Sequence, residues 1–313
     1  MSVAIVLEQM IVIFCLIGIG FFIYKKEIIS QYAYADLSKL ITEICNPAML
    51  ICSAFGETSS ITNQNLLYAG VTAIVYYVFL IFISIFIPWL IKVDKKEFVQ
   101  YHLMGVYGNI SFMGIPLIAV VLGDIAVVYL AIFILVFNLL LYTHGIAVIR
   151  SGSDEGEKKV QWRKMNTGTV AAILTLILFV VKLPVPQVVE TGLVYMGRCT
   201  TFLSMVVMGV VLARMKLKDV FTDKKLYIFA GLRYLLVPSI GTSFLKAFIR
   251  DEILLGVIAI TLALPAANIP LMLIKQHKSD GSLLAKGIVL TTILSLFTVT
   301  IVSVLLFGKL KEE

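Results

Sequence analysis

The chain has 313 residues, of which 60% are hydrophobic and only 14% are charged. Soluble domains are usually about half apolar and about a quarter charged, so this composition excludes an ordinary soluble protein. The formal net charge is +7. In a membrane protein such an excess is typical of basic cytoplasmic loops rather than of nucleic-acid binding. We therefore expect a polytopic membrane protein that is surrounded by the lipid bilayer and has no nucleic-acid partner.

The N-terminal sequence does not indicate a signal peptide, and the cysteines do not indicate a metal site. The first apolar run has no basic region or small-residue cleavage site, which indicates a retained membrane helix rather than a signal peptide. The four cysteines, Cys15, Cys45, Cys52 and Cys199, fall inside apolar runs without metal-ligand spacing, so we expect them to be small buried hydrophobic residues. No metal site and no cofactor is expected.

Apolar runs of about 20 residues recur along the whole chain, and a run of this length crosses a bilayer as a helix. The runs are continuous rather than alternating, which favours helices over the strands of a barrel. The sequence therefore predicts an all-α membrane protein with ten spans. In chain order they are 4–24, 37–56, 66–91, 98–122, 124–149, 166–183, 188–213, 226–247, 252–274 and 283–307.

The distribution of Lys and Arg predicts how these spans are oriented. Of the 26 basic residues, 19 lie on one set of connections and 5 on the opposite set. Cytoplasmic loops carry the excess, so both termini are expected on the non-cytoplasmic side of the cell membrane. The longest connection, a cytoplasmic loop at 151–165, separates a first five-span repeat at 1–150 from a second at 166–313. Because five is odd, homologous repeats must be inverted, which is a hallmark of secondary transporters.

Two spans are interrupted at corresponding places. The fourth contains GNISFMGIPLI at 108–118, with Pro116, and the ninth contains LALPAANIPLMLI at 262–274, with Pro270. Proline and glycine free backbone groups that lipid cannot satisfy, so such breaks occur where they are buried in protein or line a cavity. Half-helix N-termini that meet at the midplane favour an anion. The matched breaks therefore predict a substrate site where the fourth and ninth helices cross.

Polar and proline residues near these breaks are the candidate substrate-binding residues. Asparagine amides can donate to a carboxylate without the cost of burying a charge. The expected set takes three residues from the fourth span, two from the ninth and two from the second: Asn109, Ser111, Pro116, Asn268, Pro270, Asn46 and Pro47.

Ionisable residues inside spans are candidates for charge or proton coupling. They are Glu8, Glu43, Arg198 and Arg233. Structural alternatives stand beside these roles, since Glu43 can pair with Lys39 one turn earlier and Arg233 can extend to the cytoplasmic interface.

The histidines have structural interpretations in the sequence. His144 is expected to form inter-helix hydrogen bonds, as is Asn138, and His102 is expected at the membrane interface. No HExxH, GxSxG or nucleotide-binding loop is present, so the sequence predicts neither an enzyme nor a nucleotide-driven pump.

At these residues the sequence resembles the auxin efflux carrier family, which includes plant PIN carriers and bacterial malate-permease-like proteins. The resemblance covers nearly the whole chain and is carried by GNISFMGIPLI, by LPAANIP in the ninth span, by the proline of the second span and by RYLLVP in the eighth. It implies an inverted-repeat fold similar to that of bile acid symporters and sodium/proton antiporters. Spans one, two, six and seven would form a scaffold, and spans three to five and eight to ten a moving transport domain.

The resemblance also implies that Pro116 and Pro270 are the crossing prolines, that Asn109 contacts the substrate carboxylate, and that the substrate is a small organic anion such as auxin or malate. The long central loop of the plant carriers is absent, which favours a microbial-type member. A homodimer is compatible with the family.

Three functions fit the sequence. The leading hypothesis is a secondary transporter of small organic anions that works by alternating access. A cation/proton antiporter on the same fold is the alternative, although such a mechanism normally needs carboxylates where this chain has asparagine and serine. A membrane sensor that binds an anion without moving it is the third. Direction, coupling to protons or sodium, and subunit number are left open.

Overall fold

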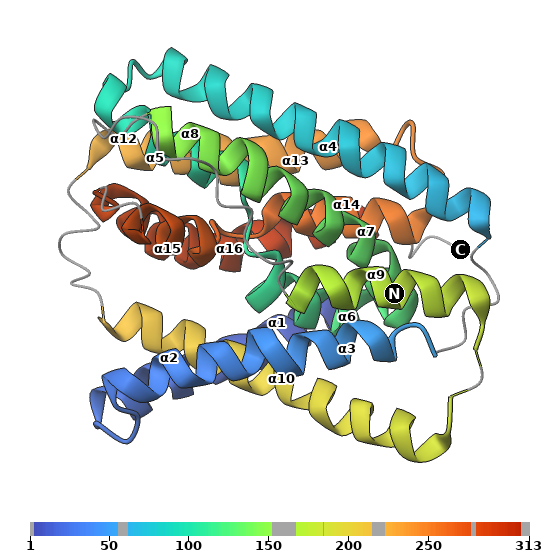
Figure 1. The fold of residues 1–313 in the computed structure, drawn as a ribbon. Helices are drawn as coiled ribbons and strands as arrows, with labels where there is room; N and C mark the ends of the chain where they lie inside the picture. The colour runs from blue at the N-terminus through green and yellow to red at the C-terminus, as the bar shows by residue number, and fades with distance from the viewer. Residues whose placement is uncertain are drawn as a thin grey trace.

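The computed structural model describes residues 3–55, 62–151, 167–183, 185–214, 223–276 and 280–307. Within these ranges the regular structure is helical and no strand is present, which confirms the all-α class (Figure 1). An isolated antiparallel bridge joins Gly108 to Ala266. The predicted central loop at 151–165 lies outside the described residues apart from Ser151.

The helices follow the predicted apolar runs, because continuous apolar sequence without strong breakers has no competing structure. Several runs are divided by a π-helical turn or by an extended break. The α-helices are α1 (Val3–Lys25), α2 (Gln31–Leu40), α3 (Asn46–Cys52), α4 (Asn63–Leu90), α5 (Lys95–Val106), α6 (Ile115–Leu122), α7 (Asp124–Leu140), α8 (Ile146–Ser151), α9 (Thr167–Val181), α10 (Gln187–Arg214), α12 (Lys224–Gly231), α13 (Val237–Leu245), α14 (Glu252–Ala263), α15 (Asn268–Gln276) and α16 (Ser282–Phe307), and the π-helical turns are η1 (Ile41–Cys45), η2 (Ile110–Gly114), η3 (Leu141–Gly145) and η4 (Leu232–Leu236).

Three of these π-helical turns end two residues before a proline. The prolines are Pro47 after η1, Pro116 after η2 and Pro238 after η4. Proline lacks a backbone N–H and its ring clashes with the preceding turn of an α-helix. A widened turn accommodates the ring without ending the helix. Pro47 and Pro116 therefore lie inside continuing helical segments and do not interrupt them.

Four helical segments in the described part of the chain are long and apolar enough to cross a membrane: Asn63–Leu90, Asp124–Ser151, Gln187–Arg214 and Lys224–Leu245. The two parts of α16, which meet at 43°, would make a fifth if they form one span. Shorter apolar helices include Ile110–Leu122 and Glu252–Ala263, which are parts of the two interrupted spans. These findings support a multi-pass membrane protein, and the count of ten spans stays a prediction.

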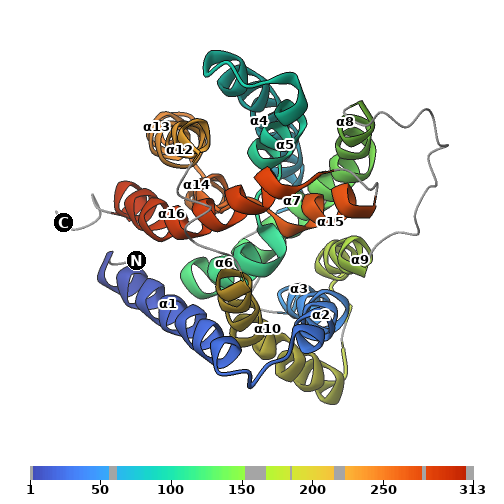
Figure 2. The ribbon, with the colours of Figure 1, turned by 90° about the vertical axis from the view of Figure 1, so that its left-hand side faces the viewer.

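The helices form two groups when the molecule is viewed end-on (Figure 2). Helices α1, α3, α9 and α10 lie on one side, and α4, α5, α12, α13, α14 and α16 lie on the other, with α6 between them. The division into a scaffold and a transport domain that the family resemblance implies stays a prediction. Whether the two groups move against each other stays a prediction.

Glycines set the separation of α1 and α10 within the first group. A Cβ atom added at Gly209 would lie 2.0 Å from the carbonyl oxygen of Ile17, and one added at Gly20 would lie 2.2 Å from that of Val206. Small residues allow helix backbones to approach this closely in a membrane protein. The two helices are therefore in backbone contact along this stretch.

Candidate substrate site at the crossing of two broken helices

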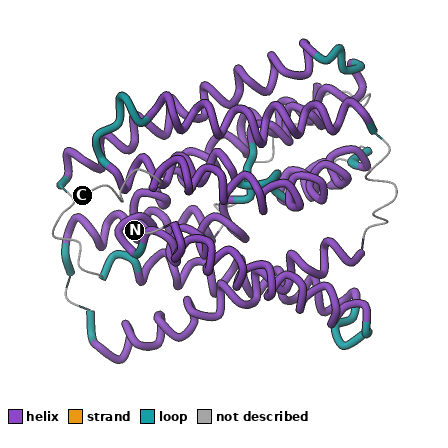
Figure 3. The backbone as a smooth tube through the Cα atoms, turned by 180° about the vertical axis from the view of Figure 1, so that it is seen from behind, coloured by secondary structure: helices purple, strands orange, loops and turns teal. Residues whose placement is uncertain are grey.

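The two interrupted spans cross each other and pair through their backbones. The non-helical segment 107–109 follows α5, and the non-helical segment 264–267 follows α14. The N–H of Asn109 donates to the carbonyl of Pro265 at 2.7 Å, and the N–H of Ala267 donates to the carbonyl of Tyr107 at 2.8 Å. Each break thus satisfies backbone groups that the other has freed. Figure 3 shows loop segments in the interior of the helical bundle as well as at its ends.

The crossing does not lie at the two prolines that were predicted to form it. Pro116 is the second residue of α6, and Pro270 is the third residue of α15. Gly108 pairs with Ala266 instead, and the proline within the extended backbone is Pro265. The breaks are in the predicted spans but at other residues, because the π-helical turn η2 lets the chain pass Pro116 without leaving the helix.

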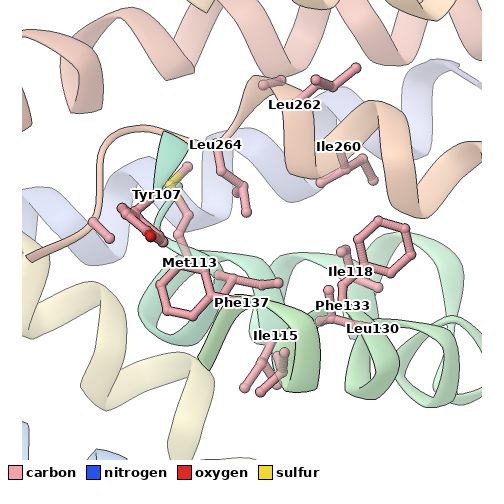
Figure 4. Close-up of a cluster of buried hydrophobic side chains, with 14 of the residues drawn as sticks. Tyr107, Met113, Ile115, Ile118, Leu130, Phe133, Phe137, Ile260, Leu262 and Leu264 are labelled. Carbon is pink, nitrogen blue, oxygen red and sulfur yellow. The ribbon is translucent and has the colours of Figure 1, made fainter. Parts of the chain in front are cut away.

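A buried hydrophobic cluster holds the crossing in place. Tyr107 and Leu264, one from each break, lie in it with Met113 of η2 and Phe137 of α7 (Figure 4). Tyr107 also stacks edge-to-face on Phe137, with the ring centroids 5.4 Å apart. The N–H of Ala266 donates to the hydroxyl of Thr291 in α16. The extended backbone is therefore enclosed by protein, as irregular structure at membrane depth must be.

Arg233 binds the C-terminal ends of both half-helices that lead into the crossing. Its side chain is 1% exposed. Its Nε donates to the carbonyl of Gly105 near the end of α5 at 2.7 Å, and its Nη1 donates to that of Leu262 near the end of α14 at 3.3 Å. Helix C-termini carry unpaired carbonyls and partial negative charge, so a buried cation is favoured there. Arg233 therefore does not extend to the interface.

Asn109 occupies the corresponding N-terminal end. It is 2% exposed and precedes η2, where its Oδ1 accepts the N–H of Phe112 at 3.2 Å. Its Nδ2 is directed at the sulfur of Met208 on α10, 3.4 Å away. A thioether is a weak acceptor. The amide donors of Asn109 are thus buried, held in place by a helix cap, and without a strong acceptor.

A second set of buried polar atoms lies on α3 and α10, two helices that pack against each other. Asn46 is 3% exposed; its Nδ2 donates to the carbonyl of Ser111 at 2.9 Å, while its Oδ1 has no hydrogen-bond partner among the described residues. The hydroxyls of Thr200 and Ser204 are likewise buried, and the described part of the chain offers them no partner. Thr200, Ser204 and Met208 are four residues apart and share one face of α10. Since α10 packs against both α3 and η2, Thr200 and Ser204 lie on the helix that contacts the elements of Asn46 and Asn109.

Buried polar groups without partners are rare and need an explanation. A ligand between α3, η2 and α10 would supply one here. Thr200 and Ser204 were not among the predicted site residues, although their spacing with Met208 on one helical face is a signal that the sequence carries.

The remaining predicted residues differ in their burial and in their contacts. Ser111 contributes its backbone carbonyl to Asn46, and Pro47 and Pro270 are buried. Asn268 begins α15 and is partly buried. The four ionisable candidates do not meet: Arg233 is buried at the crossing, whereas Glu8, Glu43 and Arg198 are exposed on their helices, with Glu43 accepting a hydrogen bond from Thr167.

The two histidines of the first half lie together. His102 is 2% exposed, so the expectation that it lies at the interface is wrong. Its Nε2 is 3.2 Å from Nε2 of His144, whose Nδ1 is 3.0 Å from the hydroxyl of Tyr107. The predicted inter-helix hydrogen bonds of His144 are confirmed.

Comparison with known proteins agrees with this architecture. Residues 5–303 match the family described as membrane transport protein. No match is found among curated proteins. Because the family match covers nearly the whole chain, including both broken helices and Arg233, the chain belongs to the membrane transport protein family of auxin efflux carrier-like transporters.

Proposed function

We propose that this protein is a secondary transporter of small organic anions, auxin-like monocarboxylates or malate-like dicarboxylates, and that it works by alternating access. In this proposal ten spans form two inverted five-helix repeats in the plasma membrane, with both termini on the non-cytoplasmic side. The group containing α1, α3, α9 and α10 acts as the scaffold. The other group carries the crossing through the membrane, and a homodimer is compatible with this arrangement.

The observation that supports the proposal is the excess of positive charge and hydrogen-bond donors at the crossing. The side chains that face it are neutral, and the nearby charge is the guanidinium of Arg233, for which no ion pair with a described carboxylate is found. The N-terminal end of η2 adds partial positive charge, and the Asn109 amide and the hydroxyls of Thr200 and Ser204 can each donate a hydrogen bond. This environment suits a carboxylate better than a metal ion or a proton-exchanging acid pair.

Uptake into proteoliposomes tests the proposal. The panel contains labelled malate, malonate, succinate and indole acetate, with an inert sugar as the blank, and sodium and pH gradients are imposed separately. Asn109→Ser is the informative variant, because serine keeps a helix-capping oxygen but loses the amide donors. A hydrogen bond to a charged group contributes about 1.5–3 kcal/mol, so apparent affinity should fall by about 10- to 100-fold.

Asn63→Ala, at an exposed residue of α4, is the matched control and should leave uptake unchanged. Saturable carboxylate uptake that depends on Asn109 supports the proposal. Cation exchange without carboxylate flux would show that the alternative, a cation/proton antiporter on the same fold, is correct.

A further inference from the structure

A hydrogen-bonded chain of three side chains leads from the interior of α5 to the crossing. It begins at His102, seven residues and about 10 Å from the start of α5. It passes from Nε2 of His102 to Nε2 of His144, and from Nδ1 of His144 to the hydroxyl of Tyr107, which also donates to the carbonyl of Leu140 at 3.0 Å. The carbonyl of Tyr107 accepts the N–H of Ala267 in the other broken helix. The chain therefore ends on a residue that forms the crossing itself.

The protons in this chain can be counted. The Tyr107 hydroxyl has one hydrogen, and when it is donated to Leu140 the phenol oxygen must accept from Nδ1 of His144. Nε2 of His144 is then an acceptor and takes the N–H of Nε2 of His102. Nδ1 of His102 then keeps its lone pair, and no hydrogen bond to this buried atom is found among the described residues, although the backbone of Ser84 in α4 lies beside the ring. The three hydrogen-bonded side chains can therefore bind one further proton, at Nδ1 of His102.

The local backbone is built around this chain. Among the four π-helical turns of the described residues, η3 is the one not followed by a proline, and it contains His144. Such turns are often found at functional sites. Gly145 lies against the phenol, since a Cβ atom there would be 3.1 Å from the Tyr107 hydroxyl oxygen. The widened turn and the glycine together let Tyr107 and His144 meet.

Few charges surround the histidines. The elements packed against α5 and η3 are α4, α7, α8 and α16, and Arg233 of η4 is bonded to α5. No described carboxylate is hydrogen-bonded or ion-paired to either ring. Besides the tyrosines, the titratable groups on these elements are Lys95, Lys96, Glu97, Asp124, Arg150, Arg233 and Lys286, and α12, which packs on η4, adds Lys224 and Lys225.

We propose that His102 and His144 form the proton-binding site of this transporter and couple anion transport to a proton gradient. This inference rests on the proposed function and names its coupling ion. The proton forms a bond to the lone pair of His102 Nδ1, no bond is broken, and the resulting imidazolium shares its Nε2–H with His144. A second proton is disfavoured, because two imidazolium rings whose Nε2 atoms lie 3.2 Å apart repel each other.

Binding of the anion and the proton is then cooperative. The pair gains a buried positive charge that has no carboxylate partner, which is unfavourable until an anion reaches the crossing. By linkage, the anion tightens proton binding by the same factor by which the proton tightens anion binding. For a monocarboxylate the loaded transport domain carries no added net charge.

Transport with an imposed gradient is the first test. A gradient of one pH unit corresponds to about 1.4 kcal/mol, so a one-to-one symporter accumulates its anion about tenfold. The variant His144→Gln should lose this accumulation, and its anion exchange at equal pH on both sides should need a higher anion concentration, because a bound proton no longer tightens anion binding. His277→Gln, at the third histidine of the chain, is the matched control and should accumulate normally.

The outcomes distinguish a failure of the proton site from a failure of the proposed function. Absence of carboxylate exchange in the unaltered protein would refute the proposed function. Carboxylate exchange with equal accumulation in the unaltered protein and His144→Gln would refute the proton site alone. If His144→Gln does not fold, His102→Gln takes its place with the same expectations.

A second measurement does not use transport. In the His277→Gln variant, labelled with ¹⁵N-histidine, the nuclear magnetic resonance spectrum contains the two rings of the pair. Both rings should shift together as one proton is taken up, and added malate or indole acetate should move that transition to higher pH. Two independent transitions, or a transition that no carboxylate of the panel moves, would overturn the proposal.

Discussion

Replacement of Gly209 by alanine should destabilise the protein, whereas the same change at Gly18 of α1 or Gly192 of α10 should not. The new Cβ atom would lie 2.0 Å from the carbonyl oxygen of Ile17 and 2.6 Å from the N–H nitrogen of Phe21. Both are backbone atoms of α1, so no side chain can rotate away. A carbon and an oxygen atom in ordinary contact are about 3.4 Å apart, and α1 must therefore move away from α10 by about 1 Å.

The size of the effect follows from the contacts that this movement weakens. A gap of about 0.5–1 Å forfeits about a quarter to a half of the attraction between two atoms. Overpacking of a close interface costs about 1–3 kcal/mol and sometimes more. Gly18 on α1 and Gly192 on α10 have no atom within 4 Å of the added Cβ. There alanine should stabilise the helix by about 0.5–1 kcal/mol, because glycine is the poorer helix former.

The assay is thermal unfolding of the purified proteins in detergent, followed by size-exclusion chromatography or intrinsic fluorescence. Gly209→Ala and Gly20→Ala should unfold at lower temperature than the unaltered protein, and Gly18→Ala and Gly192→Ala at the same or a higher temperature. The prediction is thus that the two kinds of glycine substitution do not change the unfolding temperature in the same direction. Equal behaviour of Gly209→Ala and Gly192→Ala would refute the backbone contact between α1 and α10.

Two further predictions concern the crossing. Thr200→Val keeps the shape of the side chain and removes a buried hydroxyl that has no partner among the described residues. The unfolding temperature should therefore stay equal or rise, while the apparent affinity for the anion falls about tenfold. A fall in both quantities would show that the hydroxyl has a structural role. Arg233→Lys keeps the charge but cannot reproduce both hydrogen bonds to the half-helix ends, so it should lower the unfolding temperature, measured against Arg198→Lys at an exposed position.

The sequence could predict the helices and the spans that are broken, because both follow from local composition. Long apolar runs favour helices, and glycine with proline marks where a helix is weak. The residues that cross could not be located in the same way. Pro116 is the strongest breaker in its span, yet η2 accommodates it, and the break lies at Tyr107–Asn109, where the pairing with 264–267 satisfies the extended backbone.

The contacts of the buried ionisable groups also lay beyond the sequence, because their partners are distant along the chain. His102 lies two turns from the start of its helix, and such a position indicates the membrane interface until His144 is known to be beside it. Arg233 binds two backbone carbonyls, which become available only where α5 and α14 end. A side chain whose partner is backbone leaves no pattern that residue types could reveal.

In the proposed transporter, the chemistry of the crossing would also account for the use of asparagine rather than lysine or arginine as the group nearest the substrate. A carrier must release its cargo on the far side, so binding has to be favourable enough for entry and weak enough for departure. A buried ion pair would hold the anion tightly and leave an uncompensated charge in the empty carrier. Arg233 avoids this cost because its charge is satisfied by the carbonyls of two half-helices whether or not an anion is present. The Asn109 amide, beside a weak sulfur acceptor, can then exchange Met208 for a carboxylate and back again with only a small change in free energy.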